Sequence, residues 1–253
     1  MQLQDLLFTQ GFGTRRICAG LVQRGLVALQ QQDDDDVDAQ ARWLICDDPA
    51  VDVQEDGMRF MVQGQVWEYH RHAYIAMHKP TGVECSQKPS AYPSVYSLLP
   101  APLRQRPAKG AVQGVQAIGR LDQDTTGLLL LSDDGQFIHR MSSPKKQVPK
   151  VYRVTAKHPV TDAQIERLLA GVVLDDDPRP VQAAECERRE DHVIDLTLTS
   201  GKYHQVKRML AAVGNRVEAL HRSRIGGLQL PPDLALGAWC WLYHPQLELL
   251  RQA

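Results

Sequence analysis

The stretch GRLDQDTTGLLLLSDDG, residues 119–135, determines how the rest of the chain is interpreted. It contains LLLLS at 128–132, an apolar run of strand length that ends at Asp-Asp-Gly, as expected for a fully buried strand followed by a turn. Asp122 therefore lies on a loop that leads directly into a rigid strand. Gly119 and Gly127 allow a close backbone approach or dihedral angles that other residues avoid.

Arg120, Asp122 and Asp124 form a small charged group on this loop. A neighbouring cation favours the ionised form of a carboxylate, which suits a nucleophile or a general base. The spacing also fits a structural Arg–Asp pair that orders the loop, and on spacing alone we favour this second interpretation. A glycoside hydrolase that uses both carboxylates fits poorly, because no tryptophan that could stack on a sugar lies nearby: the chain has Trp43, Trp67, Trp239 and Trp241.

Strand and helix patterns alternate on both sides of this stretch. Strands are expected at 27–29, 74–80, 128–132, 151–156 and 192–200, and helices at 3–10, 14–25, 161–172 and 204–214. Thr14 is expected to cap the second helix. Proline-rich segments at 89–107 and 178–180 are expected to be loops. Because the elements interleave with little βαβ regularity, the fold class is α+β with a mixed or antiparallel sheet.

Charge is distributed unevenly between two expected domains, residues 1–70 and residues 71–253. The first carries 5 Lys and Arg against 12 Asp and Glu, whereas the second carries 24 against 18. The basic balance of the larger domain points to an anionic partner. The four aspartates at 33–36 are interpreted as a solvated loop, because adjacent like charges repel and no regular ligand spacing accompanies them.

The five cysteines are scattered along the chain, and none is spaced as CxxC: Cys18, Cys46, Cys85, Cys186 and Cys240. This pattern favours reduced thiols over a disulfide framework or a zinc site. The N-terminal sequence has no signal-peptide layout, and no apolar run approaches the length that spans a membrane. We expect a cytoplasmic protein without a metal site or a membrane partner.

Four segments, in order, carry a resemblance to one enzyme family. GRLDxDTTGLL resembles the signature loop of the bacterial ribosomal-RNA pseudouridine synthases, and HKPTGVECS at 78–86 is similar to an early segment of that family. PKVYRV at 149–154 resembles the segment that supplies an active-site tyrosine, and residues 201–230 resemble the third conserved block. The resemblance covers roughly residues 74–245. It implies a pseudouridine-synthase catalytic domain at 71–253 with Asp122 as the catalytic residue.

The resemblance also implies roles for other side chains. Tyr152 would stack on a base or guard the site, although without the family it would be interpreted as strand packing. Lys207 would lie beside Asp122 and keep it ionised. RNA contacts are implied for Arg120, Lys202, His204, Gln205, Arg208, Arg222 and Arg224. Of these, Arg120 would also hold the catalytic loop, His204 and Gln205 could instead cap a helix, and Arg222 and Arg224 are expected on a loop that contacts the RNA backbone.

Residues 14–29 resemble the paired-basic helix and following strand of the small S4-like RNA-binding domain that precedes the catalytic domain in this family. Arg15, Arg16 and Arg24 would then contact RNA. Two features depart from the family pattern. Residues 1–13 lack an early basic residue, and the aspartates at 33–36 stand where a short hairpin is expected.

Pseudouridine formation is an isomerisation, so the resemblance implies no cofactor and no metal. The target nucleotide must be turned out of its stack. Asp122 would either attack the nucleotide covalently or remove a sugar proton, and the sequence leaves both roles open. Residues 124–129 and 203–209 are most similar to members that modify one uridine of 16S ribosomal RNA. The alternatives are a 23S isomerase of the same fold and a non-catalytic RNA-binding assembly factor. We expect a monomer whose partner is ribosomal RNA or a small-subunit assembly intermediate.

Overall fold

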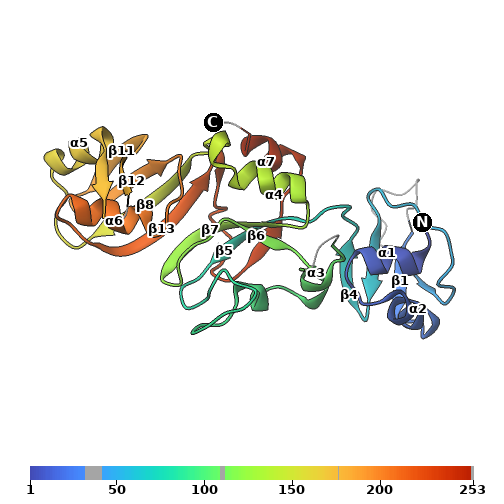
Figure 1. Ribbon diagram of the computed structural model, residues 1–253. Coiled ribbons are helices and arrows are strands. Elements are labelled where there is room, and N and C mark those ends of the chain that lie inside the picture. Colours follow the sequence, from blue (N-terminus) through green and yellow to red (C-terminus); the bar gives the residue numbers. More distant parts are fainter. Residues whose placement is uncertain (32–41, 109–111, 176, 252–253) are drawn as a thin grey trace. The chain divides into compact units, whose positions relative to one another are not determined.

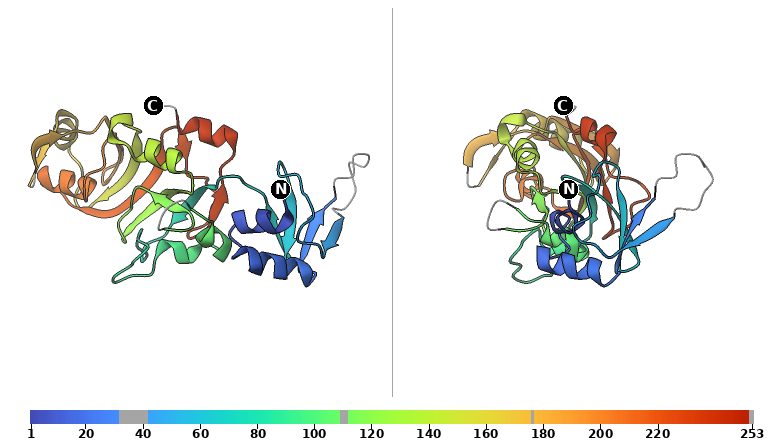
Figure 2. Two further views of the ribbon diagram at one scale, coloured as in Figure 1. Left: turned by 45° about the vertical axis from the view of Figure 1, so that its right-hand side comes forward. Right: turned by 90° about the vertical axis from the view of Figure 1, so that its right-hand side faces the viewer.

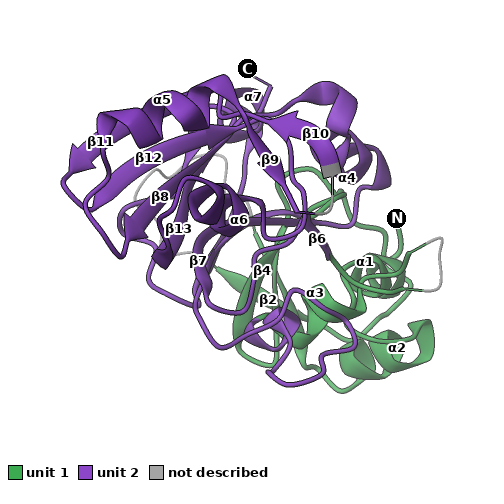
Figure 3. Ribbon diagram, turned by 60° about the vertical axis from the view of Figure 1, so that its left-hand side comes forward, with its two compact units in different colours: residues 1–73, 99–115 green, residues 74–98, 116–253 purple. Residues whose placement is uncertain are grey.

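The computed structural model describes residues 1–31, 42–108, 112–175 and 177–251 (Figure 1). The acidic run at 33–36 lies outside the described residues. None of the described helices is long and apolar enough to cross a membrane. The chain divides into two compact units, shown in Figure 3: residues 1–73 with 99–115, and residues 74–98 with 116–253.

The first unit combines short helices with a four-stranded antiparallel sheet of order β2-β1-β3-β4. Its elements are α1 (Leu3–Thr9), α2 (Arg15–Gln23), β1 (Val27–Gln30), β2 (Trp43–Cys46), β3 (Arg59–Val62), β4 (Gln65–Glu68) and α3 (Ala101–Gln105). Apolar residues of α1, α2, β1 and β3 form one buried cluster. Thr14 caps α2 as predicted, because its side chain accepts a hydrogen bond from the Ile17 N–H at 3.3 Å.

Residues 99–115 group with the first unit, whereas the expected domain boundary after residue 70 assigns them to the second. The buried guanidinium of Arg106 explains why: it donates to Gln10 Oε1 at 2.8 Å and to the carbonyl oxygen of His70 at 2.6 Å. The expectation of a loop over 89–107 is wrong in part. This segment contains the 3₁₀ helix η1 (Val95–Leu98) and α3, whose proline lies in the first turn, where a helix tolerates it.

The second unit is built on a nine-stranded mixed sheet, which confirms the α+β class. The strands run in the order β11-β12-β8-β13-β7-β5-β15, with β6 paired to β7 and β14 paired to β13. The contact between β13 and β7 is parallel, and the other pairs in this sheet are antiparallel. The strands are β5 (Tyr74–Lys79), β6 (Gln116–Ile118), β7 (Thr125–Ser132), β8 (Lys150–Ala156), β11 (Glu185–Glu190), β12 (Val193–Leu198), β13 (Val217–Ile225), β14 (Leu228–Gln229) and β15 (Trp239–Trp241).

A separate two-stranded sheet contains β9 (Val172–Leu174) and β10 (Asp177–Val181). The expected loop at 178–180 is therefore wrong. Pro178 and Pro180 lie within β10, which pairs with β9 alone among the described strands. A strand with one neighbour tolerates proline because half of its backbone N–H groups face away from the partner strand.

Helices cover the large sheet in two groups (Figures 1 and 2). The helical elements are α4 (Gly135–Ser142), η2 (Pro144–Lys146), α5 (Asp162–Ala170), α6 (Gln205–Ala212) and α7 (His244–Leu249). Helix α5 packs against β11 and α6 against β13, whereas α4 packs against β6 and β7 and α7 against β14. Each group buries its own apolar cluster. Asp122 lies on the loop that leads from β6 to β7.

Gly127 explains how β7 and β13 can lie side by side. Its φ is +113°, and a Cβ atom there would collide with the main chain of Arg222 on β13. The predicted close backbone approach is thus present at this glycine. Gly119 also has a positive φ, +72°, but faces open space, so it needs glycine for the dihedral angle alone.

Candidate active site

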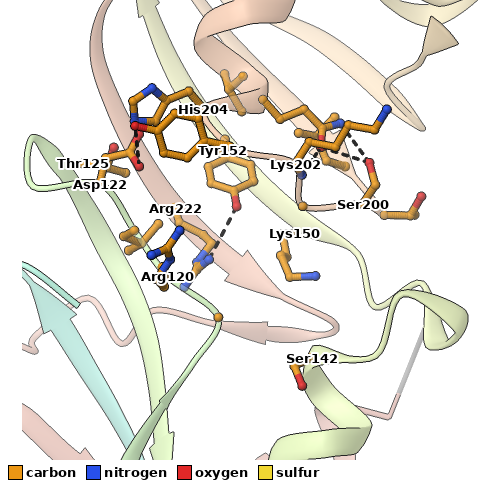
Figure 4. A pocket seen from close by; sticks show the side chains of 18 of the residues that line it. Arg120, Asp122, Thr125, Ser142, Lys150, Tyr152, Ser200, Lys202, His204 and Arg222 are labelled. Atoms are coloured by element: carbon orange, nitrogen blue, oxygen red, sulfur yellow. Dashed lines mark hydrogen bonds and ion pairs between the residues drawn. The ribbon is translucent and has the colours of Figure 1, made fainter. Parts of the chain in front are cut away.

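A cavity of about 540 Å³ opens in the second unit around the loop that precedes β7. Its walls come from residues 118–122, the end of α4 with the following turn, β8, the segment from β12 to the start of α6, and β13. Figure 4 shows Asp122, Tyr152, His204 and Arg222 around this space. Elements that are far apart in the sequence therefore converge on one carboxylate.

Asp122 is held by side chains from the start of α6. Lys207 Nζ lies 3.1 Å from Asp122 Oδ2, and His204 Nε2 lies 3.4 Å from Oδ1. The predicted proximity of Lys207 and Asp122 is present. Arg120 also lines the cavity, but within the described part of the chain no ion pair joins it to Asp122. The interpretation of an Arg120–Asp122 structural pair is therefore wrong, because the cation comes from α6.

Lys207 binds a second carboxylate, with its Nζ 2.7 Å from Asp124 Oδ1. Partial burial raises the pKa of Asp124, but the hydrogen bond and charge of Lys207 outweigh it and bring this pKa below its ordinary value. Burial likewise lowers the pKa of Lys207, and the hydrogen bonds to Asp124 and Asp122 more than compensate, so that its pKa is raised. Lys207 consequently keeps its charge throughout the neutral range.

Lys79 lies in the HKPTGVECS segment, but it was not predicted to be a site residue. Its side chain is 0% exposed, and Nζ donates to the carbonyl oxygens of Asp122 at 2.9 Å, Thr125 at 3.0 Å and Pro80 at 2.9 Å. Burial lowers the pKa of this ammonium. The signal in the sequence was a lysine at the end of an apolar strand, directly before a proline. Lys79 holds the backbone of the loop that carries Asp122, whereas Lys207 holds the Asp122 side chain.

Tyr152 lies on β8 and lines the cavity, and its hydroxyl accepts a long hydrogen bond, 3.5 Å, from Arg222 Nη1. Arg222 is 2% exposed, and its Nε donates to the carbonyl oxygen of Leu128 at 2.8 Å. The expectation that Arg222 and Arg224 form a backbone-contacting loop is wrong, since both lie on strand β13. The central position of β13 between β8 and β7 buries Arg222, and Arg224 is not among the residues that line the cavity.

Gln205 and His204 behave differently, although they are adjacent. Gln205 is 4% exposed, and its Oε1 accepts from the Lys202 N–H at 2.8 Å, so this side chain ties the turn before α6 in a capping role. His204 makes no side-chain cap, and its φ of +48° lies in the left-handed region. Its ring stacks on the ring of exposed Tyr203, with the ring centres 3.8 Å apart. Nε2 of the same ring faces Asp122. Arg208 donates to the carbonyl oxygen of Tyr203 at 3.3 Å.

The predicted RNA-binding arginines of the first unit are exposed on or next to α2. Arg15 pairs with Asp5 at 2.6 Å and lies 4.2 Å from the centre of the Phe8 ring. Arg24 Nε donates to the carbonyl oxygen of Gly20 at 2.9 Å. Arg16, on α2, is also exposed.

Comparison with known proteins identifies the family. Residues 73–212 match the model of the RNA pseudouridylate synthase family. The chain is 38% identical over 197 residues to ribosomal small subunit pseudouridine synthase A of Haemophilus influenzae, covering 78% of this chain and 81% of that protein. It is 40% identical over 200 residues to the protein of the same name from Escherichia coli K12, covering 79% of each.

Two further similarities span nearly the whole chain. An uncharacterized RNA pseudouridine synthase of Bacillus subtilis, YtzG, is 37% identical over 260 residues, covering 100% of this chain and 99% of that protein. A crystal structure of a pseudouridylate synthase superposes with a TM-score of 0.65 at 30% identity and covers 99% of both chains. The chain therefore belongs to the RNA pseudouridylate synthase family and is an isomerase.

Proposed function

We propose that this chain converts a uridine of 16S ribosomal RNA to pseudouridine, with the carboxylate of Asp122 as the catalytic group. The observation that carries the proposal is the position of Asp122 in the cavity, bound through Oδ2 by Lys207 and close to His204. The choice of 16S over 23S RNA is supported by relatives from Haemophilus influenzae and Escherichia coli that are named for the small ribosomal subunit.

A uridine inside folded RNA must leave its stack before its C1′ can approach Asp122, at a cost of a few kcal/mol. The cavity lies within the size range of nucleotide-sized ligand sites. Tyr152 offers an aromatic face for the extruded base, which offsets part of the unstacking cost. Asp122 then acts either on C1′ as a nucleophile or on a ribose proton as a base. In both roles Lys207 keeps the carboxylate oriented toward the nucleotide.

RNA binding is proposed to use basic side chains of both units. In the first unit, taken as S4-like, Arg15, Arg16 and Arg24 would contact phosphates. In the second, Arg120 and Lys202 line the cavity and would contact phosphates near the target. The protein is proposed to act as a monomer in the cytoplasm, where ribosomes are assembled.

The decisive experiment maps pseudouridine in 16S and 23S ribosomal RNA from a strain that lacks this protein and from the same strain with the gene restored. Loss of one 16S site, recovered on restoration, is the expected result. Loss of a 23S site would assign the large-subunit alternative. Unchanged maps would favour the non-catalytic assembly factor. Restoration with Asp122→Asn separates the catalytic carboxylate from any effect of protein absence.

The purified full chain should show the same preference in vitro. Naked 16S RNA, small-subunit particles and 23S RNA from the deletion strain serve as parallel substrates. Conversion in particles but not in naked RNA would identify an assembly intermediate as the substrate.

A further inference from the structure

Among the cations that line the cavity, Lys150 and Arg222 take no part in the contacts of Asp122. Lys150 and Tyr152 are two residues apart on β8, so they project from the same face of the strand. Lys150 Nζ donates to the carbonyl oxygen of Val148 at 2.9 Å. In Figure 4 the hydroxyl end of Tyr152 points toward Arg222, and Lys150 lies on that side of the tyrosine.

Burial disfavours the positive charge of both side chains. Arg222 is 2% exposed, and its buried Nη2 has no hydrogen-bond partner among the described residues. A buried N–H without an acceptor is destabilising, and such a group in a native structure calls for an explanation. Burial, followed by the charge of Arg222, lowers the pKa of Lys150 to about 8. Of the described residues that line the cavity, Asp122 is the one carboxylate, and it is bound by Lys207. The unmet positive charge indicates that the substrate supplies an acceptor there.

The chemistry of the proposed reaction requires such a site. When the C1′–N1 bond breaks, its electron pair stays on the uracil, and the negative charge spreads over N1 and the two carbonyl oxygens. C1′ is then bonded to the Asp122 carboxylate, or is joined to C2′ by a double bond after Asp122 has taken the C2′ proton. The uracil departs as an anion in either role of Asp122.

Rejoining balances the charges. C5 of the uracil anion donates an electron pair to C1′, and either the Asp122 carboxylate leaves or Asp122 returns its proton to C2′. C5 then loses its proton to solvent and N1 gains one. The uracil anion must therefore stay bound in the site, and be able to rotate, after the C1′–N1 bond breaks and before the C1′–C5 bond forms.

We propose that Lys150 and Arg222 bind the carbonyl oxygens of the detached uracil and stabilise its negative charge while it turns from N1 to C5. A base stacked on Tyr152 places its carbonyl oxygens at the ring edge, and Arg222 Cζ lies 6.0 Å from the centre of the Tyr152 ring. Donors fixed where charge develops are an effective means of stabilising it. The inference rests on the proposed function and adds two catalytic residues to it.

Lys150 makes the inference testable by pH. The charged and titratable groups that line the cavity around it are Arg222 on β13, Tyr152 on β8, Arg120 on the loop before β7, Lys202, Tyr203 and His204 before α6, and Asp122 with Lys207. The wall formed by residues 141–144 is uncharged. Arginines keep their charge at alkaline pH, and the pKa of Lys207 is raised. As pH rises through about 8, Lys150 is thus expected to lose its charge while Lys207 and the arginines keep theirs, and the isomerisation rate is expected to fall.

The test measures single-turnover release of tritium from ribosomal RNA labelled at uridine C5, because the reaction loses the C5 proton. The RNA comes from the deletion strain, and the full chain is compared with Lys150→Met, Lys150→Arg and the control Lys157→Met. Lys157 is exposed and lies just beyond the end of β8, outside the cavity lining. We expect Lys150→Met to lower the rate about 100-fold. Its RNA Kd, measured by filter binding, should change by less than about threefold, the size of a minor phosphate contact.

The arginine variant distinguishes charge from structure. Lys150→Arg should retain most of the rate and remove the decline above pH 8, because a guanidinium stays charged. The melting temperature of Lys150→Met at pH 7 should not fall, since the change removes a half-buried cation beside Arg222.

Two results would overturn the inference while leaving the proposed function intact. The first is a wild-type rate in Lys150→Met. The second is a loss confined to RNA affinity that grows with salt, which would make Lys150 a phosphate contact. Wild-type inactivity on 16S and 23S RNA, both as naked RNA and in ribosomal particles, would instead overturn the proposed function, and this inference with it.

Discussion

Lys207 and Asp122 are 85 positions apart in the sequence, yet Nζ of the first lies 3.1 Å from Oδ2 of the second. The same ammonium lies 2.7 Å from Oδ1 of Asp124. Lys207 of helix α6 thus binds two carboxylates on the loop that precedes β7. Lys79 binds the main chain of that loop at Asp122 and Thr125. Lys207 holds the side chain of Asp122 and Lys79 holds the backbone of its loop. Substitutions at the two lysines should therefore have different effects on rate and stability.

Asp122→Asn should abolish isomerisation and leave the fold and RNA binding intact. The amide keeps the size of the side chain but can act neither as nucleophile nor as base, and we expect a rate loss of more than about 1000-fold. Tritium release measures the rate, filter binding the affinity, and thermal melting the fold. Asp233→Asn, on an exposed residue outside the cavity, is the matched control. Pseudouridine formation by Asp122→Asn would refute its assignment.

Lys207→Met should lower the single-turnover rate about 100-fold, because Asp122 and Asp124 lose the cation that orients them. The free energy of unfolding should change by no more than about 1 kcal/mol, since the ion pairs are partly exposed. Lys207→Arg keeps the charge and should recover most of the rate. Equal losses in the methionine and arginine variants would show that the shape of lysine, and not its charge, is required.

Lys79→Met should weaken both stability and turnover. Three carbonyl oxygens lose their common donor, and we expect a destabilisation of about 2–3 kcal/mol in denaturant unfolding. The backbone of the loop that carries Asp122 is then no longer held in place, so kcat should fall while RNA affinity changes little. Lys88→Met, on an exposed residue further along the chain, should leave both unchanged. A Lys79→Met protein with normal kcat would exclude a positioning role.

Asp195 should govern part of the acid sensitivity of the fold. Burial raises the pKa of Asp195, but hydrogen bonds from Arg153 and Arg189 outweigh it, and the net pKa is lowered. Its stabilising contribution is therefore complete above the pKa of the unfolded chain, about 3.9. The contribution is lost as pH falls through the lower folded pKa.

Asp195→Asn should consequently lower the free energy of unfolding at pH 7 by about 1–2 kcal/mol, and the melting temperature with it. Below pH 4 the melting temperature of this variant should fall less steeply with pH than that of the wild type. The side chain of Asp195 is 9% exposed, whereas that of Asp162, which pairs with Arg188, is 85% exposed. Asp162→Asn is thus the control and should leave the pH profile unchanged. Parallel acid profiles for Asp195→Asn and the wild type would contradict the prediction.

Local sequence determined the features that depend on a few neighbouring residues. The Thr14 cap, the buried strand before Ser132 and the α+β class follow from hydroxyl chemistry and from the spacing of apolar residues. The resemblance predicted that Lys207 lies beside Asp122, whereas the spacing of the charged residues alone favoured a structural Arg–Asp pair. The loop predicted from the prolines at 178–180 was wrong, because a strand with a single partner can contain proline. Whether a strand such as β10 has one partner or two is not encoded in its own residues.

Only the tertiary structure decided which cations are buried and what they bind. Arg222 reaches Leu128 and Tyr152 because β13 lies between β7 and β8, and Lys79 reaches Asp122 because β5 pairs with β7. Such contacts join residues that are adjacent in space but separated by 43 to 94 positions in the chain. A sequence displays which residues carry charge. The packing of the strands decides which of those charged side chains are buried, and therefore which of them are desolvated and positioned at the site.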